Sequence, residues 1–141
     1  MPANLTESVV EEAALEWFGA LGYSVGHGPQ MAPGEPTSER ELFGEVVLVE
    51  RLRDALERLH SAIPPDAREE ALRKTLRVAT PSLAQTNRAF HRLLRDGVDI
   101  EYTRPDGSLK HDKAWLVNFS DVQANDWLAV NQFTVVEGQH N

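Results

Sequence analysis

The sequence contains no cysteine, which excludes disulfide bonds, a thiol nucleophile and cysteine-based zinc sites. It also lacks a long hydrophobic run, because the uncharged stretches near its start are short and interrupted by glutamates. Neither a signal peptide nor a membrane span is therefore predicted. Only three lysines are present and aromatic residues make up 7 % of the chain. These absences fit a protein of the reducing cytosol, and a cytoplasmic location is the expectation.

What is present is typical of an ordinary globular domain. The length of 141 residues suffices for one continuous core, and 26 % of the residues are charged. The formal charge of −8 argues against a free-standing nucleic-acid binder. The charge is unevenly spread, since residues 1–50 hold nine acids and one base, while residues 51–113 hold thirteen bases and ten acids. The middle of the chain is therefore mildly basic, which permits nucleic-acid contact without indicating it.

Apolar residues recur every three or four positions in the first two thirds of the sequence, which predicts helices. A first helix follows the possible N-cap Thr6 and stops at Gly22. A short strand at 23–25 and an irregular loop at 26–38 come next. Further helices are expected over 45–60, over 66–76 and from Pro81 or Ser82 to the stop at Gly97.

The period then changes from 3.6 to 2, which indicates strands. Residues 98–104 alternate and precede a turn at 105–108. Segments 113–119 and 127–136 follow with short connections, so the three segments predict an antiparallel unit. The fold class is therefore α/β (α+β), with N-terminal helices followed by an antiparallel β-unit.

Two searches for phosphate chemistry are negative. No glycine-rich phosphate loop is present, so no ATP-binding residue is predicted. Hydrolysis of phosphodiesters with Mg²⁺ needs carboxylates at strand ends and a nearby lysine, often as Glu-x-Lys. The residues two positions before the lysines are Leu72, Ser108 and His111, and none is acidic. The sequence thus lacks a complete nuclease motif of this type.

Several residue types remain open to two interpretations. Glu7 and Glu11 lie one helical turn apart and can share one face of the helix. Their negative charges either stabilise the helix near its positive N-terminal end or contribute to a metal site built from strands elsewhere. Arg88, Arg92 and Arg95 share one helix face, which is either solvated or binds phosphates. The three tryptophans are expected to pack in the core: Trp17, Trp115 and Trp127. The five histidines are scattered and are not expected to bind a metal: His27, His60, His91, His111 and His140.

The amino-acid sequence resembles that of a known family along nearly the whole chain. The matching stretches run from Leu5 to Tyr23, from Arg51 to Pro65, from Asn87 to Val98, and from Asn125 to Asn141. They are similar to the start of the restriction (R) subunit of type I restriction–modification enzymes. This resemblance implies a PD-(D/E)xK endonuclease domain with Mg²⁺ at the cleavage centre, followed by motor domains that hydrolyse ATP. The implied partners are DNA and the specificity and methyltransferase subunits.

The resemblance implies that Glu11 corresponds to the family's first-helix glutamate, a catalytic and metal-binding residue. Glu7 is the second choice for this role. The family's Asp and Glu-x-Lys follow a segment like Gly138–Asn141. Residues 1–141 are therefore expected to be a nuclease domain truncated before its catalytic strands and inactive alone. The alternative is a non-catalytic module that docks in the complex or binds the DNA backbone. An exposed strand over 127–136 would favour a homo-oligomer.

Overall fold

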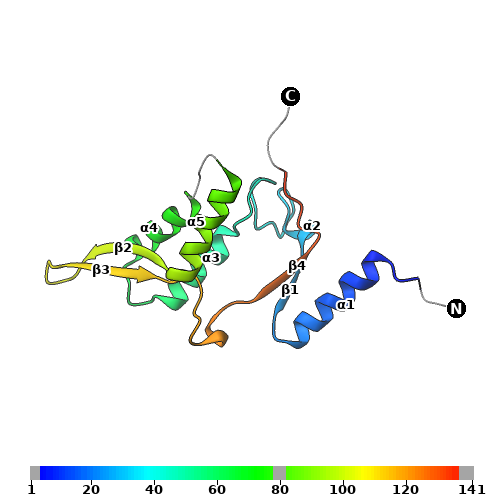
Figure 1. Cartoon of the computed structure of the whole chain (residues 1–141), viewed down its shortest axis with the longest axis horizontal. Coiled ribbons are helices and arrows are strands. Elements are labelled where there is room, and N and C mark those ends of the chain that lie inside the picture. The colour runs from blue at the N-terminus through cyan, green and yellow to red at the C-terminus, as the bar shows by residue number, and fades with distance from the viewer. Residues whose placement is uncertain (1–3, 78–81, 137–141) are drawn as a thin grey trace, which may run out of the picture. The chain divides into compact units, whose positions relative to one another are not determined.

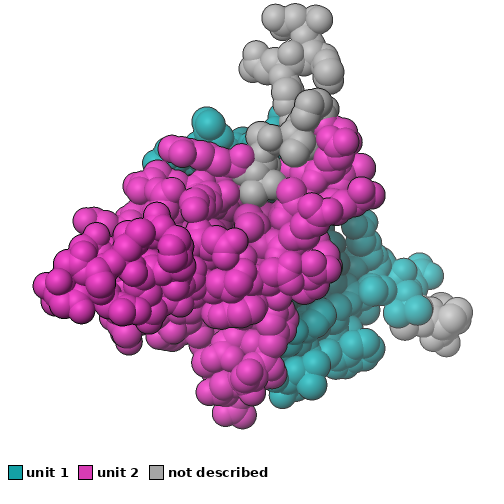
Figure 2. All heavy atoms as spheres, turned by 60° about the vertical axis from the view of Figure 1, so that its left-hand side comes forward, with its two compact units in different colours: residues 1–48, 126–141 teal, residues 49–125 magenta. Residues whose placement is uncertain are grey.

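A computed structural model describes residues 4–77 and 82–136 of the chain. The chain forms two compact units, which Figure 2 colours separately. The first unit comprises residues 1–48 and 126–141, and the second comprises residues 49–125. None of the helices described is long and apolar enough to cross a lipid bilayer.

The described residues of the second unit form three α-helices and a β-hairpin (Figure 1). The helices are α3 (Val49–Leu59), α4 (Pro65–Leu76) and α5 (Leu83–Asp96). Helix α5 begins and ends at local signals, since the Ser82 side chain accepts a hydrogen bond from the backbone N–H of Gln85 and Gly97 follows α5 with φ 79°. Helix α3 begins four residues after the predicted start at 45. Pro81, the other predicted start of α5, lies outside the described residues. The core joins α3, α4 and the hairpin through buried side chains that include Leu56, Ala71, Leu72, Val98 and Ile100.

The hairpin consists of β2 (Val98–Thr103) and β3 (Leu109–Ala114), which pair antiparallel with Val98 opposite Ala114. Its turn lies where it was predicted. The Asp106 carboxylate accepts hydrogen bonds from the backbone N–H and the hydroxyl of Ser108, and Gly107 has a φ of 88°. A short 3-10 helix η1 (Val122–Ala124) follows. The alternating burial of β2 places Val98 and Ile100 in the core, as period-2 patterning requires.

The first unit contains α1 (Glu7–Ala20), β1 (Ser24–His27), α2 (Gly28–Met31) and β4 (Leu128–Asn131). Strands β1 and β4 pair in parallel, with Ser24 opposite Leu128 and His27 opposite Asn131. Helix α1 contacts both strands, and Figure 1 shows it beside β1. Residues far apart in the sequence therefore build this small layered structure.

The mixed α/β class and the antiparallel unit after the helices are confirmed, but this unit has two strands and the predicted third strand is wrong. Residues 128–131 pair with β1 instead of extending the hairpin, and the strand expected over 113–119 lies at 109–114. The prediction considered only neighbours joined by short connections, whereas β1 and β4 are joined by a crossover through the whole second unit. The predicted loop at 26–38 also contains the short helix α2.

The expectation that the tryptophans pack in a core is also wrong for two of them. The side chain of Trp17 is 71 % exposed and that of Trp115 is 37 % exposed. Trp127 is half-buried, and its ring centroid lies 5.8 Å from that of Tyr23. Helix α1 has no fully buried residue, because one short parallel pair of strands is too small to cover its apolar positions.

Candidate functional site

A polar cluster lies at the carboxyl ends of β1 and β4. Parallel strands end at the same edge of a sheet, so the register brings His27 and Asn131 side by side at their last positions. Helix α1 adds Glu11 to this edge, and Gln132 follows directly after β4. The carboxyl edge of parallel strands is where α/β proteins commonly place functional side chains.

Glu11 accepts two amide hydrogen bonds at this edge. Asn131 Nδ2 lies 3.3 Å from one carboxylate oxygen and Gln132 Nε2 lies 2.6 Å from the other. The Glu11 residue is half-buried. Glu7, one turn earlier, is exposed, and none of the described side chains bonds to it. The structure thus brings Glu11 to the cluster and leaves Glu7 outside it.

His27 completes the cluster through its ring nitrogen Nδ1, which lies 3.0 Å from Asn131 Oδ1. From the sequence, His27 is expected to be an ordinary scattered histidine, and neither Asn131 nor Gln132 is predicted as a site residue. His27 lies 104 positions before Asn131 in the sequence. No local signal singles them out, since His27 falls in the predicted loop 26–38 and Asn131 lies inside the predicted strand 127–136.

The backbone around the cluster is tightly packed. Gln132 has φ 52°, a left-handed conformation that is unusual for a residue other than glycine. A Cβ atom at Gly28 would overlap the backbone carbonyl oxygen of Gln132. Glycine at 28 therefore lets the chain after β1 approach the chain after β4. Such strained and close backbone is often found where side chains are held for function.

The cluster does not form a complete metal site. Among the described residues, no group of three or more histidine, aspartate or glutamate side chains could hold a metal ion. Mg²⁺ prefers six oxygen ligands and is usually bound by more than one carboxylate or phosphate. Glu11 offers one carboxylate, so the residues described do not fit Mg²⁺ by themselves, and none forms a phosphate loop for ATP.

The three arginines of α5 differ in their surroundings. Arg88 and Arg92 are exposed, and neither forms a direct ion pair in the described parts of the chain, although the charge of Arg92 also helps to lower the pKa of Asp96. Arg95 instead donates from Nε and Nη2 to the two carboxylate oxygens of Asp96, at 2.8 and 2.7 Å. These bonds hold the pKa of Asp96 below its usual value. Two of the three predicted phosphate-binding side chains are therefore available.

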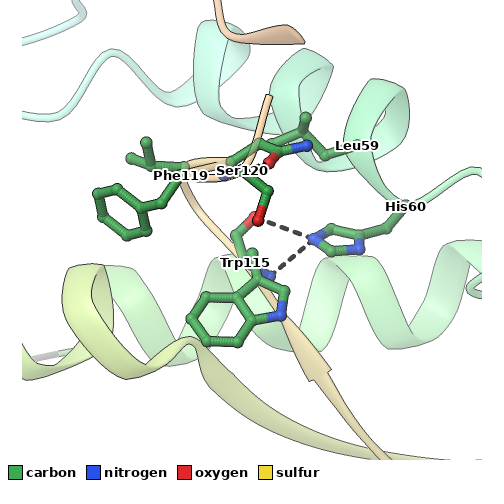
Figure 3. A pocket seen from close by; sticks show the side chains of 7 residues that line it. Leu59, His60, Trp115, Phe119 and Ser120 are labelled. Atoms are coloured by element: carbon green, nitrogen blue, oxygen red, sulfur yellow. Dashed lines mark hydrogen bonds between the residues drawn. The ribbon is translucent and has the colours of Figure 1, made fainter. Parts of the chain in front are cut away.

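A separate pocket of about 280 Å³ lies within the second unit (Figure 3). Trp115 and Phe119 line it, and His60 lies at one side. His60 Nε2 is 2.7 Å from the backbone nitrogen of Trp115 and 2.9 Å from its carbonyl oxygen. Because a backbone N–H can only donate, His60 accepts from it and fixes the chain after β3. The imidazole is thus used structurally.

Comparison with known proteins gives one family and two relatives. The family described as "Type I restriction enzyme R protein N terminus" matches residues 4–141. The chain is 31 % identical over 131 residues to the type I restriction enzyme HindI endonuclease subunit of Haemophilus influenzae, covering 93 % of this chain and 12 % of that protein. It is 28 % identical over 134 residues to the putative type I restriction enzyme MjaIXP endonuclease subunit of Methanocaldococcus jannaschii, covering 94 % and 13 %.

The chain therefore spans about an eighth of the length of the curated relatives that it matches. No solved structure matches it. The similarity covers both strands of the Glu11 cluster, since the matched residues include 4–141.

Proposed function

The chain belongs to the family of type I restriction enzyme R protein N termini, and from this membership we propose that it supplies scaffold and one acidic residue to a Mg²⁺-dependent DNA endonuclease. The parent subunit would cleave unmodified foreign DNA while its motor domains hydrolyse ATP to translocate the duplex. DNA and the specificity and methyltransferase subunits would be its partners in the cytoplasm. Both relatives are named as endonuclease subunits of type I restriction enzymes, which supports the endonuclease part of this proposal.

The placement of Glu11 is the observation that carries the proposal. Its carboxylate reaches the carboxyl edge of two parallel strands, and two amide donors hold it there at 3.3 and 2.6 Å. Neither donor is a cation, so the negative charge of Glu11 is not neutralised by them. A metal ion bound at this edge would therefore find a fixed, charged oxygen ligand.

One carboxylate does not make a nuclease. Mg²⁺-dependent hydrolysis of a phosphodiester commonly uses two or three carboxylates to hold the metal ion, together with a lysine. None of the three lysines belongs to a Glu-x-Lys motif. We therefore propose that residues 1–141 alone do not cleave DNA and that further residues of the parent subunit complete the centre.

A cleavage assay tests the role of Glu11. In the full-length subunit assembled with its partners, Glu11→Ala is expected to lower Mg²⁺-dependent cleavage of plasmid DNA by at least about 100-fold, since even outer-shell metal partners cost 10- to 100-fold. ATP hydrolysis is expected to persist. Glu12→Ala removes a neighbouring exposed glutamate and serves as the control. Full cleavage by Glu11→Ala would contradict the proposal.

The same assay on the isolated chain tests its inactivity. Supercoiled plasmid incubated with residues 1–141 and Mg²⁺ is expected to remain intact. Robust nicking that Glu11→Ala abolishes would show that the chain carries a complete centre, and would refute the proposal that other residues are needed.

A second candidate function rests on Arg88 and Arg92. Both are exposed on α5, one helical turn apart, and no described acidic side chain pairs with them. They suit contacts to two DNA phosphates, which would make the second unit a backbone-binding module of the restriction complex. This function and the nuclease role do not exclude each other.

DNA binding across a salt series separates phosphate contacts from a solvated helix face. Replacing both arginines by glutamine is expected to reduce the salt slope by about 2, because each phosphate contact contributes about 0.9. A double Arg53→Gln and Arg73→Gln variant removes equal charge, but from arginines already paired with glutamates. Binding that is flat in salt, or lost equally in both variants, would remove the idea.

A further inference from the structure

We propose that His27 is a further residue of the Glu11 site and that Asn131 positions it, so that its Nε2 atom is held as a hydrogen-bond acceptor. Nothing in the family description or in the relatives' names assigns a role to His27 or Asn131. The hydrogen-bonding state of His27 follows from the contacts of this chain. Only the group that its Nε2 atom would bind rests on the proposed function.

Glu11 fixes the orientation of the Asn131 amide. A carboxylate has no hydrogen to donate, so the Asn131 group that faces it must be the Nδ2 donor, as observed at 3.3 Å. The Asn131 Oδ1 acceptor then faces the other way, 3.0 Å from His27 Nδ1. Turning the amide over would place two acceptors against each other at Glu11.

The amide in turn fixes the tautomer of His27. Because Oδ1 can only accept, Nδ1 must carry the hydrogen that forms this bond. In neutral imidazole the other nitrogen then has a free lone pair, so Nε2 is an acceptor. The His27 residue is exposed, and its Nε2 bonds to none of the described residues. Free histidine prefers the opposite tautomer, with hydrogen on Nε2, so the cluster selects the less common form.

The backbone holds the three residues in this order. The parallel register sets His27 opposite Asn131, and Gly28 allows the two chains to stay close beyond the strand ends. The left-handed Gln132 then turns its side chain back to Glu11, where its Nε2 lies 2.6 Å from the carboxylate. Two amides therefore fix Glu11, and one of them connects it to the imidazole.

An outward acceptor beside a fixed carboxylate suits a water molecule that must be oriented. His27 Nε2 would accept one hydrogen of this water, with the negative charge of Glu11 stabilising the polarised imidazole through Asn131. In the proposed nuclease, His27 would be a positioning residue for water at the edge of the centre.

The tautomer is measurable without metal or DNA. The chain is labelled with ¹⁵N-histidine, and long-range ¹H–¹⁵N correlations are recorded at about pH 8.5, two units above the ordinary histidine pKa. His27→Gln identifies the His27 signals among those of the five histidines. Hydrogen is expected on Nδ1, with a pyridine-type Nε2.

Two variants at 131 separate the relay from a general structural effect. Asn131→Leu removes the acceptor, and the ratio of the two tautomers is expected to shift toward Nε2–H by roughly tenfold, as loss of one hydrogen bond of ordinary strength implies. The double variant Glu11→Gln with Asn131→Asp keeps an acceptor for Nδ1 and gives the new carboxylate an amide donor in place of the Glu11 carboxylate, so it is expected to retain the Nδ1–H form. Glu12→Gln, which changes an exposed charge on the same helix, is expected to leave the ratio unchanged.

Hydrogen on Nε2 in the unmodified chain would overturn the inference. An unchanged tautomer ratio in Asn131→Leu would overturn it as well, since Asn131 would then not set the tautomer. Failure of the proposed nuclease is distinguishable, because the tautomer is read in the absence of metal and substrate. Conversely, the wrong tautomer would leave the cleavage result for Glu11→Ala unaffected.

Discussion

Replacing the buried Arg40 is expected to destabilise the first unit strongly. Arg40 is the single basic residue among residues 1–50, and only 4 % of it is exposed. Its guanidinium donates to three backbone carbonyl oxygens, those of Phe43, Glu45 and Thr134, at 2.7, 2.9 and 2.8 Å. It thereby joins the segment 38–45 to the chain that follows β4.

The magnitude follows from these contacts. Each carbonyl that loses a buried donor costs about 1 to 3 kcal/mol, and such costs are less than additive when water enters. The guanidinium carbon also lies 4.0 Å from the ring centroid of Phe133, a cation–π contact of about 1 kcal/mol. Arg40→Met, which keeps the length and removes all donors, is expected to lower the free energy of unfolding by about 3 to 5 kcal/mol.

Arg40→Lys keeps the positive charge but lacks the planar fork that reaches three carbonyls at once. It is expected to lose about 1 to 3 kcal/mol, less than Arg40→Met. Arg88→Met is the matched control, because Arg88 is exposed and its replacement should change stability by less than about 0.5 kcal/mol.

Urea unfolding followed by tryptophan fluorescence measures these differences, and amide hydrogen exchange localises them. Exchange is expected to accelerate at Val136, whose N–H bonds to the Phe43 carbonyl 3.0 Å away. A loss below about 1 kcal/mol in Arg40→Met would refute the reasoning, because the three part-buried carbonyls would then be satisfied without the guanidinium.

Three further predictions concern backbone packing, acid stability and association. Gly28→Ala is expected to lower the free energy of unfolding by at least about 2 kcal/mol, because its Cβ would overlap the Gln132 carbonyl. Gly19→Ala in α1 meets only ordinary contacts and should raise it by about 0.5 to 1 kcal/mol. Thermal unfolding of both variants measures the difference. Hydrogen bonding from the backbone of the next residue lowers the pKa of Asp112 below its ordinary 3.8, so stability present above that value should fall as the pH drops through the lowered pKa. Urea midpoints measured between about pH 5 and pH 2 should show this loss blunted in Asp112→Asn. Within the segment 127–136 only β4 forms a strand, and β1 covers one of its edges, so the homodimer or aggregation is expected through the other edge of β4; a monodisperse monomer in sedimentation would contradict it.

The helices were predictable because their signals are local. Apolar spacing, the Ser82 cap and Gly97 place α5 at Leu83–Asp96, close to the predicted 82–96. The turn at 105–108 was predictable for the same reason, since aspartate and glycine set its backbone and side-chain bonds. The exposed Trp17 was not, because periodicity identifies an apolar face without identifying what covers it.

The sequence by itself determined the helices, the hairpin turn, the absence of a complete nuclease motif and the resemblance to the R subunit family, which the family comparison confirms. Through that resemblance Glu11 was placed ahead of Glu7, since the residues alone left both open. Only the tertiary structure decided what surrounds Glu11, because the parallel pairing of β1 with β4 joins residues about a hundred positions apart. That pairing brings His27, Asn131 and Gln132 to one edge. Their hydrogen-bonding roles arise from proximity, which no local pattern encodes.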